Sequence, residues 1–321
     1  MTVRIVSYNL LVSIYAEQED YYIKCQSKYL QRDYRWNLIQ AELEKEILHQ
    51  ENTIVCLQEL CLSMLPKLEL FFRRLKYTLF SNLYGGAWND YMGVGVAIPM
   101  SMQINEISYV KIGDYIRSIC KPRLDTTVDS DDARDNGMNP WDTAMERLNT
   151  LICLELVIDN QPLCVGTYHM PCLYKMPDVM IIHSSIVKDL MFQKAAGKNL
   201  ILAGDFNFEA KDRSYQGITR KGYLENRFPK SNEYIVDYQP KTEQILKSAY
   251  QEKNGSEPIY TNFSSTPDSP DFRATLDYIF FAGSLKVESV LELPAQPTGE
   301  SYPDETHPSD HLMIAATFQL S

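Results

Sequence analysis

The chain has 321 residues, of which 45% are hydrophobic and 23% are charged, and its formal net charge at pH 7 is −11. These proportions are typical of a globular protein with a sizeable core and do not indicate global disorder. An acidic chain has no broad basic face for neutralising phosphates. Nucleic acid would therefore bind weakly, only at a short end, or through metal ions.

The cysteine pattern and the apolar runs indicate in which cellular compartment the chain is expected. The seven cysteines are scattered and form no Cys-x-x-Cys pair, which argues against a zinc ribbon and a disulfide scaffold. Residues 1–8 alternate like a strand and do not resemble a signal peptide. No apolar run approaches the roughly 20 residues of a membrane helix. We therefore expect no membrane association and a reducing, cytoplasmic location.

The first half of the chain alternates strand and helix patterns. Apolar residues at helical spacing predict one helix from about Tyr34 and another that Ser63 caps and that holds Pro66 in its first turn. Residues 121–146 are acidic and poor in apolar residues, and we expect a mobile insertion there. The predicted strands cover residues 3–8, 53–59, 77–83 and 91–98.

The second half predicts more strands in adjacent pairs. A hairpin is expected from residues 149–158 and 162–169, a helix over 178–195, and another helix over 241–253 that Asn254-Gly255 ends. The pattern favours two packed sheets flanked by helices. The remaining predicted strands begin at residue 199 and cover 274–281, 285–293 and 311–318.

The segment from Lys198 to Asn207 is the most informative stretch. Its apolar run predicts a buried strand that delivers Asp205 and Asn207 to its carboxyl end, with Gly204 letting the backbone turn. Side chains at i and i+2 of an extended segment share a face, so both can address one ligand. The alternative is an Asx turn, in which both side chains cap backbone groups.

Other predicted strands also end in polar side chains that their apolar surroundings do not explain. Several acids on separate strands, together with two histidines, are typical of a catalytic centre. Oxygen ligands and amides without a Cys/His cluster suit Mg²⁺ or Mn²⁺, and such a site suits phosphoester hydrolysis. These side chains are Asn9, Glu59, His169 and Asp277, and Asp310-His311 opens the last strand.

Six short motifs carry a family resemblance. They are, in chain order, Ser-Tyr-Asn-Leu, Leu-Gln-Glu, Thr-Tyr-His, Gly-Asp-Phe-Asn, Leu-Asp-Tyr-Ile-Phe and Pro-Ser-Asp-His. Together they resemble the endonuclease/exonuclease/phosphatase superfamily over residues 4–318. The resemblance implies a four-layered α/β sandwich, with two mostly antiparallel sheets flanked by helices, in a single catalytic domain over residues 1–321.

Local segments resemble one branch of this superfamily, that of the deadenylases, nocturnin, Angel and 2′-phosphodiesterase. The segments are Asn9-Leu10-Leu11 without an acid two positions after the asparagine, Asp33-Tyr34-Arg35, and Tyr260-Thr261-Asn262-Phe263 with Asp271-Phe272-Arg273. In this branch Phe272 corresponds to an aromatic residue that stacks on a terminal base. Asn262 is expected to contact the substrate as well.

The resemblance also implies roles for the polar strand ends. Glu59 becomes the principal metal ligand, with Asn9 beside it. Asp205 would orient or deprotonate the attacking water, and Asn207 would hold phosphate oxygens. His169 would stabilise the charge that develops on the phosphate.

The last strands supply an acid–imidazole pair. The resemblance implies that His311 contacts the scissile phosphate or a second metal and that Asp277 fixes its tautomer. Asp310 either supports this site or only caps the turn. Arg147 and Asn149 begin a strand that faces the same region and could touch phosphate, although a salt-bridged arginine is an equal alternative.

The implied activity is that of a Mg²⁺-dependent phosphoric ester hydrolase with one or two ions, Mn²⁺ being an alternative. We expect a 3′–5′ exoribonuclease that releases nucleoside 5′-monophosphates from an RNA 3′ end. The first alternative is a phosphodiesterase or phosphatase acting on a 2′,5′-oligonucleotide, a dinucleotide or a cofactor. The second alternative is a DNA endonuclease. A catalytically dead binding scaffold is disfavoured because every expected catalytic position is filled.

Overall fold

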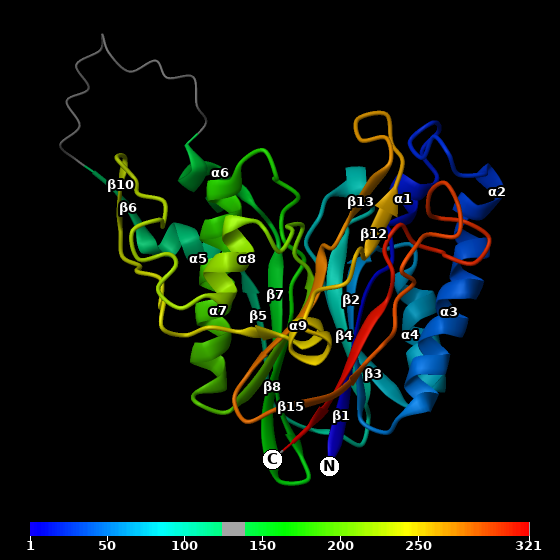
Figure 1. Ribbon diagram of the computed structural model, residues 1–321, viewed down its shortest axis with the longest axis horizontal. Coiled ribbons are helices and arrows are strands. Elements are labelled where there is room, and N and C mark those ends of the chain that lie inside the picture. The colour runs from blue at the N-terminus through cyan, green and yellow to red at the C-terminus, as the bar shows by residue number, and fades with distance from the viewer. Residues whose placement is uncertain (124–138, 321) are drawn as a thin grey trace.

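The computed structural model describes residues 1–123 and 139–320. Over these residues the chain forms two six-stranded sheets packed face to face, with helices on both outer faces (Figure 1). The first sheet has the order β15 (Lys286–Val290), β16 (Ile314–Gln319), β1 (Thr2–Asn9), β2 (Thr53–Leu60), β4 (Gly93–Pro99) and β3 (Tyr77–Leu83).

The second sheet mirrors the first in its pairing. Each sheet contains one parallel pair, β1 with β2 and β8 with β9, and its other pairs are antiparallel. The predicted sandwich of two mostly antiparallel sheets is therefore confirmed. The order of the second sheet is β11 (Lys247–Ser248), β14 (Asp277–Ala282), β9 (Asn199–Asp205), β8 (Gln161–Thr167), β7 (Thr150–Ile158) and β5 (Gln103–Lys111).

Alternation along each strand divides the apolar side chains between two cores. In β9, Ile201 and Ala203 lie in the core between the sheets, whereas Leu200 and Leu202 face the helices outside the second sheet. Successive side chains of a strand point to opposite faces, so a central strand that is covered on both sides must be apolar throughout. This explains why the central strands read as continuous apolar runs.

The helices cover the outer faces. In Figure 1, α3 and α4 lie against the first sheet, and α5, α7 and α8 lie on the opposite side of the molecule. None of the described helices is both long enough and apolar enough to cross a membrane. The helices are α1 (Ser13–Ala16), α2 (Ser27–Leu30), α3 (Arg32–His49), α4 (Leu65–Arg74), α5 (Ile112–Ile119), α6 (Pro140–Glu146), α7 (Pro177–Ala195), α8 (Arg213–Thr219) and α9 (Ala249–Asn254), and Ala87–Asn89 form a short 3₁₀ helix.

Three local predictions were wrong. Ser63 does not cap α4, because the residue before this helix is Met64 and no side chain bonds to the helix start. The helix expected over 241–253 begins only at Ala249, after the short strand β11. The strand expected over 274–281 is split between β13 (Phe272–Ala274) and β14, since β13 pairs with β12 (Asn262–Ser264) in a separate hairpin.

The predicted acidic insertion at 121–146 contains regular structure at both ends. Strand β6 (Cys120–Pro122) pairs with β10 (Tyr234–Val236), and α6 packs Trp141 and Ala144 into the core outside the second sheet. Residues 124–138 lie outside the described part of the chain. The insertion is thus not one continuous loop, because its last third carries buried side chains.

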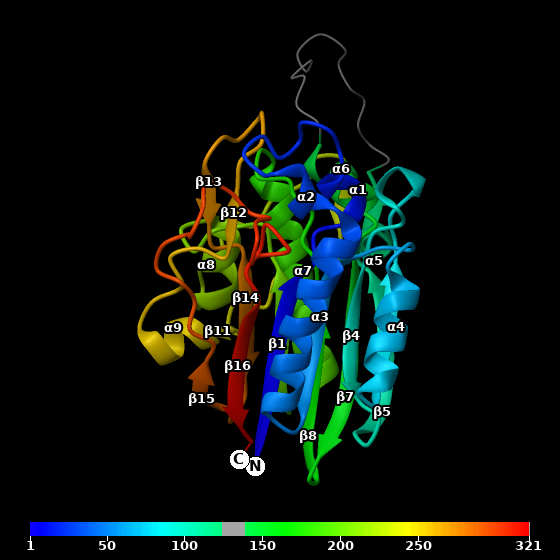
Figure 2. The same cartoon turned by 90° about the vertical axis from the view of Figure 1, so that its right-hand side faces the viewer.

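Both termini lie at one edge of the sandwich (Figures 1 and 2). The strands β1, β2, β8 and β9 run from that edge to the opposite one, where the chain crosses between the sheets through long loops. The polar residues that the sequence singled out lie at this opposite edge.

Candidate active site

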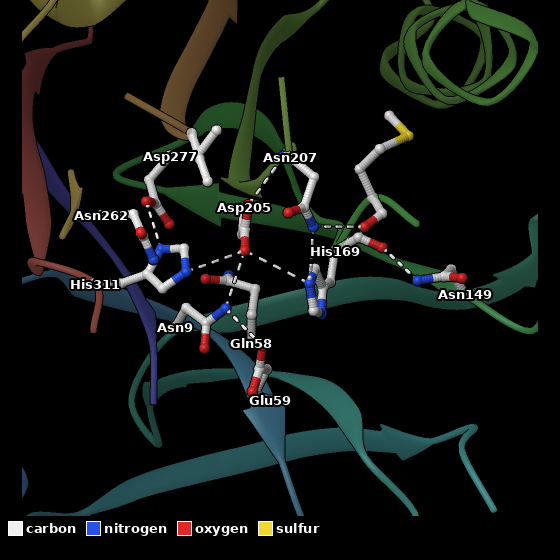
Figure 3. A network of polar contacts seen from close by, with 12 residues as sticks. Asn9, Gln58, Glu59, Asn149, His169, Asp205, Asn207, Asn262, Asp277 and His311 are labelled. Atoms are coloured by element: carbon white, nitrogen blue, oxygen red, sulfur yellow. Dashed lines mark hydrogen bonds and ion pairs between the residues drawn. The ribbon is translucent and has the colours of Figure 1, made fainter. Parts of the chain in front are cut away.

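The strand pairing brings the predicted acids together. β14 runs antiparallel to β9, and their register places Asp277 opposite Asp205. The end of β9 also meets the end of β1, because Nδ2 of Asn9 donates to Oδ2 of Asp205 at 2.9 Å. Residues that lie far apart in the chain therefore share one site between the sheets (Figure 3).

Asn9 bridges two carboxylates. Its Nδ2 also donates to Oε1 of Glu59 at 3.0 Å, while its Oδ1 accepts the Leu11 amide at 3.0 Å. Glu59 lies at a bulge of β2 with φ +57°, and its Oε2 accepts the amide of Val12 at 2.8 Å. The bulge turns this carboxylate toward the site, since an extra residue re-aims the side chain. Asn9 thus acts here as a donor that holds Glu59 and Asp205.

His311 and Asp277 form the predicted acid–imidazole contact. Nδ1 of His311 lies 2.8 Å from Oδ2 of Asp277, and Nε2 lies 3.6 Å from Oδ2 of Asp205. Burial lowers the pKa of His311, but the carboxylates of Asp277, Asp205 and Asp310 outweigh this effect, so the pKa is raised well above the usual value. The hydroxyl of Thr261 donates to Oδ2 of Asp277 at 2.6 Å.

His169 and Asn207 complete the centre on the side of β8. Nδ2 of Asn207 lies 3.2 Å from Nε2 of His169, which itself lies 3.5 Å from Oδ2 of Asp205. The amide of Asn207 also donates to Oδ1 of Asp205 at 2.9 Å. The Asx turn therefore forms, and the second oxygen of Asp205 faces the two histidines.

The donor set fits a divalent cation. Asp205, Asp277 and His311 can each place one ligand atom so that these atoms lie within 4.8 Å of one another. Oδ1 of Asp277 is buried and has no hydrogen-bond partner among the described residues, so its lone pairs are available. Carboxylate oxygens with one imidazole suit Mg²⁺ or Mn²⁺. Glu59, which the resemblance implied as principal ligand, is joined to this cluster through Nδ2 of Asn9, which contacts both Glu59 and Asp205.

A large cavity opens above these residues. Its volume is about 1180 Å³, and its lining includes the predicted substrate residues Asn149, Asn262 and Phe272. Arg147 is the single lysine or arginine along the described lining, and its guanidinium forms no ion pair with a described carboxylate. The acidic lining residues are Glu19, Asp20, Glu59, Glu146, Asp205, Glu209, Asp212, Asp268 and Asp310.

The predicted substrate residues also support the site through hydrogen bonds. Nδ2 of Asn149 donates to the carbonyl of His169 at 2.7 Å. Nδ2 of Asn262 donates to Oδ2 of Asp310 at 3.2 Å, and the hydroxyl of Tyr22 donates to the same oxygen at 3.0 Å. Asp310 is therefore not the cap of its turn. Ser309 has that position, because its hydroxyl accepts the amide of His311 at 3.1 Å.

The named motifs contain two positioning residues whose roles the sequence did not predict. Gln58 donates to the hydroxyl of Thr167 at 3.1 Å and so links β2 to β8, and Figure 3 shows Gln58 close to Asn9 and Asp205. Arg35 is buried and donates to the carbonyls of Leu10, Leu11 and Pro308, which joins the loop after β1 to the segment before Asp310. Its position beside Trp36 on the apolar face of a helix was the available signal.

The other histidines and Cys172 have different surroundings. His183 is fully buried between the Tyr168 hydroxyl and the Ala144 carbonyl, at 2.8 and 3.1 Å, so its role is structural. Cys172 lines the cavity and is exposed as a whole residue. The carboxylates of Asp205 and Glu59 add to burial of the sulfur atom in raising the pKa of this thiol to about 11, so it is a weak nucleophile at neutral pH.

Comparisons with known proteins agree with the sequence motifs. The model of the Endonuclease/Exonuclease/phosphatase family matches residues 6–311. Human 2′,5′-phosphodiesterase 12 is 24% identical over 332 residues, which cover 97% of this chain and 51% of that protein. Carbon catabolite repressor protein 4 homolog 4 of Arabidopsis thaliana is 36% identical over 127 residues, 38% of this chain and 27% of that protein. The chain thus spans about half or less of the length of these curated relatives.

Solved structures of the same branch share the fold. ANGEL2 in complex with adenosine-2′,3′-vanadate, described as a 2′,3′-cyclic phosphatase, has a TM-score of 0.73 at 19% identity and covers 99% of this chain and 95% of its own. The human nocturnin catalytic domain has a TM-score of 0.65 at 18% identity, with coverages of 100% and 94%. The expected resemblance to the deadenylase, nocturnin, Angel and 2′-phosphodiesterase branch is confirmed.

Proposed function

The chain belongs to the Endonuclease/Exonuclease/phosphatase family, and from this membership we propose that it is a metal-dependent phosphodiesterase acting on nucleotide substrates. The observation that carries the proposal is the buried cluster of Asp205, Asp277 and His311 at the floor of a large open cavity. Phosphoester hydrolysis requires a cation site, a group that handles the attacking water and donors for phosphate oxygens. This cavity floor has candidates for all three.

We assign the cation site to the carboxylates of Asp205 and Asp277, with Glu59 close by and the imidazole of His311 beside them. Mg²⁺ or Mn²⁺, when bound there, would neutralise phosphate charge. Asn9 orients two carboxylates by donating to both, which leaves their remaining lone pairs for ligand and water. Such supporting hydrogen bonds set the direction in which a ligand oxygen points.

The remaining groups handle protons and phosphate oxygens. Oδ2 of Asp205 is the candidate acceptor for the proton of the attacking water. His311 carries a raised pKa, so it is protonated at neutral pH and can donate from Nε2 to a phosphate oxygen. His169 and the side-chain amide of Asn207 would donate to the other phosphate oxygens, where negative charge develops in the transition state.

The leading substrate is the 3′ end of RNA, with nucleoside 5′-monophosphates as products. Phe272 supports this choice because it is exposed and lines the cavity, as a stacking residue for a terminal base should. The relatives include proteins named as 3′-5′-exoribonucleases of the CCR4-Not complex. A terminal base on Phe272 would set the scissile phosphate at the cation site.

A short nucleotide is the second candidate, and the charge of the cavity favours it. Acidic side chains surround the opening, and Arg147 is the one arginine or lysine among the lining residues that the structure describes. Long polyanions need several phosphate contacts to bind, and this lining offers few. Relatives named for 2′,5′-phosphodiesterase and 2′,3′-cyclic phosphatase activity fit this alternative.

A substrate panel tests the proposal. Purified protein is incubated with 3′,5′-oligoadenylate, 2′,5′-oligoadenylate, adenosine 2′,3′-cyclic phosphate and supercoiled DNA, each with millimolar Mg²⁺ and with EDTA. We expect one or both oligoadenylates to release AMP with Mg²⁺ and not with EDTA. Asp205→Asn is the matched variant that we expect to be inactive. Nicking of DNA with intact oligoadenylates would favour the endonuclease alternative. Binding without cleavage of any substrate would favour a scaffold.

A further inference from the structure

The loop between β3 and β4 places a tryptophan at the catalytic cavity. Trp88 lines the cavity and is 71% exposed, whereas Trp36 and Trp141 are buried at 8% and 1%. Burying a tryptophan in a core is strongly favourable, so an indole left in solvent at a cavity wall gains no folding energy from packing. Its placement calls for a ligand with a flat apolar face.

Hydrogen bonds of the loop hold the backbone that carries this indole. Asn89 is buried, and its Oδ1 accepts the amide of Gly86 at 2.9 Å. The carbonyl of Asp90 accepts the amide of Leu62 at 2.9 Å, which fastens the loop to the end of β2. The indole lies over Gly86, where an added Cβ would come within 2.9 Å of the ring. A rigid aromatic surface binds with little loss of conformational entropy.

Trp88 lies across the catalytic centre from Phe272. In the first sheet, β3 and β4, which flank the loop of Trp88, lie at one side, and β16 lies toward the other side. Between them lie β2 and β1, which carry Glu59 and Asn9. The hairpin of β12 and β13, which presents Phe272, is joined to the segment before β16 by the bridge between Asn262 and His311. Figure 2 shows this hairpin and β4 on opposite sides of β1.

Stacking must supply much of the affinity in this cavity. The described lining has Arg147 as its one arginine or lysine among many carboxylates, so contacts to further phosphates are scarce. A stacked base contributes about 1–3 kcal/mol and needs no positive charge. Two aromatic residues on opposite sides of one cation site suit two bases joined through one phosphodiester.

We propose that Trp88 stacks on the second base of the substrate, so that the enzyme recognises two nucleosides, one on each side of the scissile phosphodiester. This inference rests on the proposed function and deepens it, because it makes a dinucleotide unit the recognised element. Phe272 would hold the base of the released nucleotide, and Trp88 the base on the other side of the cleaved bond.

Binding of adenylyl-(3′→5′)-adenosine tests this assignment without turnover. The full chain is titrated in EDTA with this dinucleotide and with AMP by isothermal titration calorimetry. We expect tighter binding of the dinucleotide than of AMP, a loss of about tenfold or more for the dinucleotide in Trp88→Ala, and recovery of most of it in Trp88→Phe. Tyr109→Ala removes an exposed aromatic residue of β5 outside the cavity and should match the parent.

Three outcomes would overturn the proposal. The first is equal affinity of the parent for the dinucleotide and for AMP, and the second is unchanged dinucleotide affinity in Trp88→Ala. The third is a loss of dinucleotide affinity in Tyr174→Ala and not in Trp88→Ala, since Tyr174 is another exposed aromatic residue of the lining. Cleavage of the dinucleotide at millimolar Mg²⁺ is scored separately. Failure of the proposed function and failure of the Trp88 assignment therefore appear in different measurements.

Discussion

Nδ2 of Asn9, at the end of β1, donates to Oδ2 of Asp205, at the end of β9, over 2.9 Å. This bond connects the two sheets at the point where the candidate cation cluster begins. Because Asn9 is fully buried and Asp205 is 1% exposed, water cannot replace the bond. This bond and the buried bond from Gln58 to Thr167 therefore join the two sheets at the site.

Replacing Asn9 by alanine removes the donor that both Glu59 and Asp205 share. We expect kcat/KM to fall about 10- to 100-fold, as is usual when a partner that orients ligands is lost. Metal affinity, measured by calorimetry with Mn²⁺, should fall with it. Asn105→Ala, an exposed site on β5, is the control. An Asn9→Ala protein with parental activity and metal affinity would remove Asn9 from the site.

Asp277→Asn tests the acid–imidazole pair. The amide keeps the shape of the side chain but loses the charge that holds His311 protonated, so we expect kcat to fall about 10- to 100-fold with a smaller change in KM. The hydroxyl of Thr261, which donates to Asp277 in the parent, can still donate to the one side-chain oxygen that asparagine keeps, so the fold should be preserved. Asp178→Asn, which lies at an exposed ion pair with Arg213, is the matched control. Equal losses in both variants would point to a general effect on stability.

Metal removal should abolish activity and lower thermal stability together. A cation that binds only the folded chain adds RT ln(1 + [M]/Kd) to the free energy of unfolding. We expect the unfolding temperature to rise with Mg²⁺ or Mn²⁺ in the parent and to rise less in Asp205→Asn, followed by differential scanning fluorimetry. A parent protein that cleaves its substrate fully in EDTA contradicts the cation site.

Much of the arrangement could be predicted because the site residues sit at the ends of buried strands. An apolar run predicts the strand, and the first polar residue after it marks the sheet edge, which located Asn9 and Asp205 at the ends of β1 and β9. Asp277 was predicted within a strand, and in the structure it is the first residue of β14. Their mutual approach depends on the antiparallel pairing of β14 with β9 and on the packing of β1 against β9 between the two sheets, which no local sequence pattern gives. The roles of these residues stay predictions until variants are measured.

The missed features depend on contacts that have no local pattern. Arg35 looks like an ordinary helical residue until the structure shows three carbonyls converging on it. Trp88 looks like part of a turn between Gly86 and Asp90, and its function as a cavity wall comes from the neighbouring sheet. The helix expected from residue 241 was wrong because tertiary pairing of β11 with β14 overrode its helical spacing.

Glu42 predicts a pH dependence of stability away from the site. Burial raises its pKa from 4.5 to about 7 in the folded chain. Between these values the folded state binds more protons than the unfolded state, so the free energy of unfolding falls as pH rises from 4.5 to 7. Glu42→Gln should remove this loss, worth about 3 kcal/mol. Urea denaturation of parent and variant at pH 5 and pH 8 measures it, and an equal pH dependence of both would contradict it.

Gly204 is required by a close approach between two backbones. It lies within β9 and does not make a turn, contrary to the sequence interpretation. An added Cβ would come within 1.9 Å of the Tyr168 carbonyl oxygen. Tyr168 cannot move aside freely, because it is fully buried and its hydroxyl contacts His183 at 2.8 Å.

Gly204→Ala should therefore push the end of β8 away from β9 and displace His169, the next residue. We expect a loss of about 1–3 kcal/mol in the free energy of unfolding and a fall in kcat of about tenfold or more. Gly299→Ala is the control, because its added Cβ would meet only Asp304, at 3.4 Å. Activity is measured well below the unfolding temperature of each protein, so that lost stability and a displaced histidine are separated. A destabilised Gly204→Ala protein with parental kcat would show that His169 tolerates this displacement.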